Sequence, residues 1–69
     1  MTFVIRHEKY KDSYLTKVEP GNAGDVYTYR AGLDCARVYK KIEAEELARA
    51  CGGVAVHVKR VKGRLEEAE

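Results

Sequence analysis

The stretch KIEAEELARACGGVAVHV, residues 41–58, decides the fold of this chain. Within it, apolar residues recur with the i, i+3, i+4, i+7 spacing of one helical face, at Ala44, Leu47, Ala48 and Cys51. Gly52 and Gly53 follow, and a glycine after the last helical turn is a common helix stop. Valines then alternate with other residues from 54 to 59, which is the period of a half-buried strand. The stretch therefore predicts a helix, a stop and a strand.

Three further strands are expected before this helix. The first runs from Phe3 to about His7, and the second from Tyr14 to Val18. The third is Val26–Tyr29, which is rich in β-branched and aromatic residues. Proline, glycine and asparagine gather in Glu19–Asp25, which predicts a long loop between the second and third strands.

These elements predict an α+β domain of order β-β-β-α-β, with an antiparallel sheet of about three to four strands and one helix packed on one face. The domain is expected to span residues 1–62, and residues 63–69 are expected to be a charged, frayed tail. Residues 33–39 fit either a helical turn from Leu33 to Ala36 or an extended connection. The valines of the last strand are expected to meet the apolar helix face. Alternation leaves open which sheet face the helix covers, because a slip of a single residue inverts every side chain.

Composition narrows the class of protein. The chain has 69 residues with 13 basic and 11 acidic side chains, and its net charge of +2 does not by itself imply nucleic acid. No apolar run approaches the ~20 residues that span a bilayer, and the N-terminus lacks the apolar segment of a signal peptide. We therefore expect a single cytoplasmic domain with reduced thiols.

Four residues have the chemistry of metal ligands or of a catalytic pair: His7, Cys35, Cys51 and His57. Zinc modules usually place their ligands in close pairs on tight turns, and no such pair occurs here. Cys51 falls at the end of the predicted helix, where the dipole disfavours a thiolate, and no motif orients either histidine. The sequence predicts no metal, no cofactor and no catalytic residues.

The order of short motifs resembles a recurrent type of small bacteriophage-encoded protein of unknown function. The matching residues are Tyr14-Leu15, Ala36-Arg37-Val38-Tyr39, Glu45-Glu46-Leu47-Ala48, Gly52-Gly53 and the valines 54, 56 and 58. The match extends from Phe3 to about Val61, but Lys41 stands where a Ser or Thr helix cap is expected. The resemblance implies a phage or prophage accessory protein that acts in the host cytoplasm, and it brings no catalytic residues.

One helix cannot cover both faces of a sheet, so the other face is expected to be partly bare and to mark an interface. This predicts a non-enzymatic interaction module that binds a protein partner or a second copy of itself. The alternative is a weak nucleic-acid binder that would use a basic run and exposed aromatic rings. Its contact residues would be Tyr27, Tyr29, Lys59, Arg60, Lys62 and Arg64.

Overall fold

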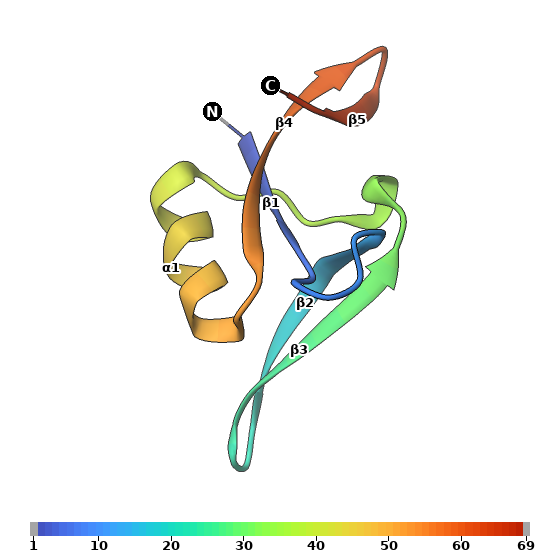
Figure 1. The fold of residues 1–69 in the computed structure, drawn as a ribbon. Helices are drawn as coiled ribbons and strands as arrows, with labels where there is room; N and C mark the ends of the chain where they lie inside the picture. The colour runs from blue at the N-terminus through green and yellow to red at the C-terminus, as the bar shows by residue number, and fades with distance from the viewer. Residues whose placement is uncertain (1, 69) are drawn as a thin grey trace.

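The computed structural model describes residues 2–68, so Met1 and Glu69, the outer ends of the predicted domain and tail, lie outside it. The elements are β1 (Thr2–Arg6), β2 (Ser13–Gly21), β3 (Gly24–Ala31), a 3₁₀ turn η1 (Leu33–Cys35), α1 (Lys41–Cys51), β4 (Val54–Val61) and β5 (Arg64–Glu67). Within residues 2–68 the strands form one antiparallel, five-stranded sheet of order β3-β2-β1-β4-β5 (Figure 1). The predicted α+β class is confirmed, and the sheet is larger than expected.

The extra strand is β5, in the segment expected to be a frayed tail. Lys62 and Gly63 both have positive φ, 51° and 80°, which is the backbone of a tight hairpin turn. They fold Arg64–Glu67 back onto β4, in a register that pairs Val61 with Arg64. The tail prediction for residues 63–69 was therefore wrong over β5, because the glycine of this turn lies among charged residues that hide the strand pattern.

The helix begins and ends where the sequence predicts. Gly52 caps it in the left-handed region at φ 75°, and its N–H donates to the carbonyl oxygen of Ala48. Gly53 is needed for a different reason, close approach. A Cβ atom there would lie 2.8 Å from Cγ2 of Ile5 and 2.9 Å from the carbonyl oxygen of Arg6. The absent side chain lets the chain pass directly against β1.

The second and third strands form a hairpin, and its tip at Glu19–Asp25 is a tight turn rather than the long loop that was predicted. β2 continues to Gly21 and β3 begins at Gly24, so only Asn22 and Ala23 lie between the strands. Pro20 is tolerated in β2 because Gly21 and Gly24 form the hydrogen-bonded pair, which leaves the proline nitrogen on the side away from β3. The β2–β3 hairpin projects from the rest of the molecule, whose longest dimension is 40 Å (Figure 1).

Strands β1 and β2 diverge after a short pairing, and the segment before the helix lies between them. They pair at Arg6 and Tyr14 and then diverge. The segment before the helix enters the gap, where the N–H of Arg37 donates to the carbonyl oxygen of Leu15 at 3.1 Å. Phe3 and Tyr39 exchange two backbone hydrogen bonds of 2.8 and 2.7 Å. Residues 33–39 therefore combine both predicted alternatives, a 3₁₀ turn followed by an extended connection.

The helix covers the alanine side of β4, and the valine side faces away from it. Ile5, Leu15 and Ala44 are fully buried on the helix side, with Ala55 packed against them. Val58 is instead buried with Val4 and Tyr14 on the opposite face. The expected contact between the valines and the helix was wrong. The alternation in β4 is compatible with either face meeting the helix. The structure uses the face with Ala55, because the small Ala44 and Ala55 let the helix and the sheet approach closely.

The opposite face is not bare where it was expected to be. Leu33 and Ala36, in and just after η1, pack over Val4 and Tyr14. Val4 is 0% exposed and Tyr14 6% exposed as a result. A single turn of 3₁₀ helix therefore closes the centre of the face that the helix leaves open.

Candidate functional site

The residues predicted to contact nucleic acid lie at opposite edges of the sheet. Tyr27 and Tyr29 are on the edge strand β3, and both are half-buried in the helix-side cluster. The basic residues lie on the β4–β5 hairpin at the other edge: Lys59, Arg60, Lys62 and Arg64. The structure brings the basic residues together with one another but not with the tyrosines.

Tyr29 is engaged within the fold. Its hydroxyl lies 3.3 Å from Sγ of Cys51, to which it donates a hydrogen bond that joins β3 to the end of the helix. Its ring also meets the edge of the His7 ring, with centroids 4.8 Å apart. Burial raises the pKa of the Tyr29 phenol, and the hydrogen bond to Cys51 raises it further. A side chain held on three sides is poorly placed to stack on a nucleic-acid base.

The most distinctive hollow is a groove of about 500 Å³ between the η1 segment and the β4–β5 hairpin. We call it the arginine groove. One wall comes from the segment that begins at η1, and the other from the hairpin. The lining residues are Asp34, Ala36, Arg37, Val38, Arg60, Gly63, Arg64 and Leu65.

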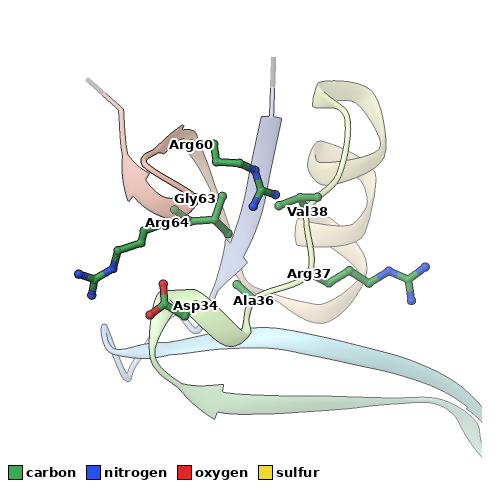
Figure 2. A pocket seen from close by; sticks show the side chains of 8 residues that line it. Asp34, Ala36, Arg37, Val38, Arg60, Gly63 and Arg64 are labelled. Atoms are coloured by element: carbon green, nitrogen blue, oxygen red, sulfur yellow. The ribbon is translucent and has the colours of Figure 1, made fainter.

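Three arginines line this groove, and their guanidinium groups point in different directions. Figure 2 shows Arg60 reaching from β4 across the groove toward Val38, while Arg37 and Arg64 extend outward on either side. All three arginines are exposed. The ion pairs formed within residues 2–68 join Arg6 to Glu67 and Lys17 to Glu19, so none of the three groove arginines is neutralised by an ion pair there.

The Arg37 guanidinium lies 5.9 Å from the centre of the Tyr39 ring, a cation–π arrangement on the side of the hollow that borders the helix. Burial raises the pKa of the Tyr39 phenol, and the nearby charge of Arg37 opposes that effect. The backbone of Arg37 therefore lines the arginine groove, while its guanidinium extends away from it (Figure 2).

The rest of the groove is mixed in character. Asp34 supplies one carboxylate beside the arginines. Leu65 and Ala36 are half-buried and present apolar surface, and Val38 is 39% exposed. No aromatic ring lines the groove among the residues that the structure describes. The site can bind an anionic group next to an apolar one.

The sequence indicated two of the eight residues that line this groove. Arg60 and Arg64 were proposed as contact residues, but Asp34, Arg37 and Val38 were not. Arg37 lies more than twenty positions before Arg60 in the chain, and nothing in its local pattern indicates where it will be placed. The packing of η1 against β5 brings the two walls together.

A second hollow, of about 360 Å³, lies beside the helix. It is lined by Tyr39, Glu43, Glu46, Leu47 and Ala50. Its charge is acidic, so the molecule carries negative charge along the helix and positive charge at the β4–β5 hairpin.

The histidines and cysteines are distributed over the fold. Nδ1 of His7 accepts the N–H groups of Lys9 and Tyr10, at 3.0 and 3.2 Å, which fixes the turn after β1. His57 packs on Phe3, with ring centroids 5.2 Å apart. Cys35 is an exposed free thiol. Between Thr2 and Ala68, no three His, Cys, Asp or Glu side chains come together in an arrangement that could hold a metal ion.

Among the described residues, no helix has the length and apolar character required to cross a membrane. Comparisons of the chain with protein families, with curated proteins and with solved structures found no match.

Proposed function

We propose that the chain is a non-enzymatic interaction module that holds an anionic group of a partner in the arginine groove. The observation that carries the proposal is that Arg60 and Arg64, from one hairpin, line the groove and form no ion pair inside residues 2–68. Guanidinium groups bind carboxylates and phosphates through paired hydrogen bonds, so they suit an anion supplied from outside.

The groove has the size of a recognition site. Its volume of about 500 Å³ lies within the usual range of ligand pockets. Both walls are anchored in the fold, since Ala36 packs into the cluster of Val4 and Tyr14, and Leu65 joins the same cluster. A site built on packed elements keeps its shape before the partner arrives, which reduces the entropy cost of binding.

The setting that we propose is that of a bacteriophage accessory protein in the host cytoplasm. This part rests on the resemblance of the Tyr-Leu, Ala-Arg-apolar-aromatic and Gly-Gly motifs described above. Self-association is also retained as a proposal. It would use the free edges of β3 and β5, because η1 covers the centre of the face that was expected to be bare.

Nucleic-acid binding is the second candidate function. It is favoured by four basic residues on one hairpin, and it would not need the tyrosines of β3 if the phosphate backbone alone were bound.

The proposal is tested by the side-chain Nε–Hε signals of Arg60 and Arg64 in NMR spectra. We expect an anionic probe, either a glutamate-rich peptide or a thymidine oligonucleotide, to shift the signals of Arg60 and Arg64 and to leave that of Arg49 on the helix unchanged. If neither probe shifts the groove signals, or if Arg49 moves equally, the proposal fails.

A further inference from the structure

The free edge of β5 runs beside the arginine groove. The sheet order places β5 at the end of the sheet, so it pairs with β4 on one side only. Along this antiparallel ladder, Val61 and Arg64 form the hydrogen-bonded pair next to the turn, and the N–H of Ala68 donates to the carbonyl oxygen of His57 at 2.8 Å. Because hydrogen-bonded pairs alternate along such a ladder, the backbone N–H and C=O groups of Leu65 and Glu67 point away from β4.

An extended peptide could therefore add to this edge as a further strand. The edge strands of sheets bind peptides in this way, through main-chain hydrogen bonds, while side-chain pockets set the specificity. A third hollow, of about 370 Å³, is lined by Arg64, Leu65 and Glu66 and shares two residues with the arginine groove. The two hollows place side-chain pockets along the same strand that offers the open backbone groups.

The charges select the chemistry of that peptide. Acidic side chains would meet the guanidinium groups of Arg60 and Arg64, which form no ion pair within residues 2–68, and such charge-assisted hydrogen bonds are stronger than neutral ones. An apolar side chain of the peptide would meet Leu65 and the exposed part of Val38. A peptide that combines acidic and apolar residues matches both halves of the groove.

A nucleic-acid strand matches the groove less well. The Asp34 carboxylate would repel phosphates and carboxylates alike, but a peptide can place one of its N–H groups beside Asp34, which a row of phosphates cannot do. No aromatic ring lines the groove within residues 2–68, so the base stacking that supports single-strand binding is not available there. Tyr27 and Tyr29, which could stack on bases, lie at the opposite edge of the sheet.

We infer that the partner of this protein presents an extended acidic peptide, with at least one apolar residue, which lies along the free edge of β5 with its carboxylates on Arg60 and Arg64. The inference rests on the proposed function and specifies the partner for the same groove.

The experiment compares three fluorescein-labelled probes by anisotropy with the full chain. The first is a peptide of glutamate residues with a central leucine, the second is the same peptide with glutamine for every glutamate, and the third is a thymidine oligonucleotide. We expect the acidic peptide to bind at least about tenfold more tightly than the glutamine peptide, because the loss of even one charge-assisted hydrogen bond weakens binding by about that factor. The advantage should shrink as salt is raised.

Matched variants locate the binding. Arg60→Gln and Arg64→Gln should each weaken the acidic peptide by about tenfold. Arg49→Gln, which makes the same change of charge on the exposed helix surface, should leave the affinity unchanged. Folding of each variant is checked by its thermal unfolding, and Arg60→Lys, which keeps the charge without the planar fork, gives an intermediate loss.

Amide hydrogen exchange separates edge addition from simple charge attraction. The bound acidic peptide should slow exchange at Leu65 and Glu67, whose N–H groups are open, and leave Arg64 and Glu66 unchanged, because these are already bonded to β4.

The outcomes are distinct. If the oligonucleotide binds and the acidic peptide does not, the peptide inference is overturned. The groove would still bind anions, and nucleic-acid binding, the second candidate function, would be favoured. Equal binding of the acidic and glutamine peptides, or unchanged exchange at Leu65 and Glu67, would also overturn the inference. Absence of binding by all three probes would overturn both proposals.

Discussion

The two faces of the sheet are closed by different means. The helix side is covered by an 11-residue helix whose Ala44 lies directly on the fully buried Ile5 and Leu15. The other side carries Val4, Tyr14 and Val58, and it is covered by one turn of 3₁₀ helix together with Leu65 of β5. The small Ala44 lets the helix approach the large residues beneath it closely, whereas the smaller cluster on the other side needs only a thin cover. In a domain of 69 residues, this arrangement buries both faces with one helix.

The largest expected effect comes from emptying the helix side. Leu15→Ala should lower the free energy of unfolding by about 2–5 kcal/mol, because Leu15 is fully buried and the helix cannot collapse into the cavity. Val58→Ala, on the other face, should cost only about 1.5–2.5 kcal/mol from the loss of two methyl groups. Urea unfolding of the two variants measures the difference. Equal losses would show that the two faces do not differ in this way.

The glycine pair at the end of the helix should show two different costs. Gly53→Ala introduces a Cβ atom against the backbone of Arg6 and the side chain of Ile5, and should cost about 1–3 kcal/mol. Gly52→Ala meets nothing within 4 Å but forces a left-handed residue, and should cost about 1 kcal/mol. Thermal unfolding under identical conditions compares them. A greater loss of stability at Gly52 than at Gly53 would mean that the left-handed helix stop contributes more to stability here than the close packing of Gly53 against β1.

Removing the thin cover should have a smaller effect. Leu33→Ala should cost about 1–2 kcal/mol, because Leu33 is half-buried over Val4 and Tyr14. Val26→Ala is the control, since Val26 is 56% exposed and its truncation should change the free energy of unfolding by less than about 0.5 kcal/mol. Sedimentation equilibrium of the Leu33 variant adds a second reading. If uncovering this face drives association, the average mass should rise above that of the parent, and no change in either measurement would contradict the covering role of η1.

The smallest effect at neutral pH is expected from the buried phenols. Burial raises the pKa of Tyr29 on the helix side, and burial together with the charge of Glu67 raises that of Tyr14 on the other face. In the unfolded chain these phenols lose their protons near pH 10. Between that pH and the higher folded values, the native state holds more protons, so the free energy of unfolding decreases as pH rises.

Tyr29→Phe and Tyr14→Phe should each make this decrease shallower while changing stability at pH 7 by no more than about 1 kcal/mol. Urea unfolding at neutral pH and at about pH 10.5 gives the slope for each variant. A slope identical to that of the parent would show that the replaced phenol is not protected by the fold. The two slopes together compare how strongly the fold keeps each phenol protonated.

Local pattern was a reliable guide to most elements of this fold. The helix from Lys41 to Cys51, its left-handed stop at Gly52 and the strand that follows are all visible in the sequence. Local pattern failed where long-range pairing decides the structure. At Glu19–Asp25, strand pairing extends through a proline and two glycines. At β5, a hairpin turn recruits a charged segment that has no strand signal of its own.

A β-bulge in β2 explains why alternation could not show which of its side chains face the helix. The register shifts between Leu15 and Lys17, so Leu15 and Val18 pack in the same helix-side cluster. Strict alternation would place them on opposite faces. A bulge depends on the partner strand, here through the hydrogen bond from Oγ1 of Thr16 to the carbonyl oxygen of Thr28, and is therefore invisible in the pattern of one strand.

The sequence by itself determined the α+β class, the position of the helix and its glycine stop, because these depend on residues close together in the chain. It also indicated the basic residues Arg60 and Arg64. Only the tertiary structure decided which face the helix covers, how the other face is closed, and that Arg37 and Asp34 meet the β4–β5 hairpin in one groove. The physical reason is that these features arise from packing between segments distant in sequence, and side-chain periodicity carries no information about which segment will be the neighbour.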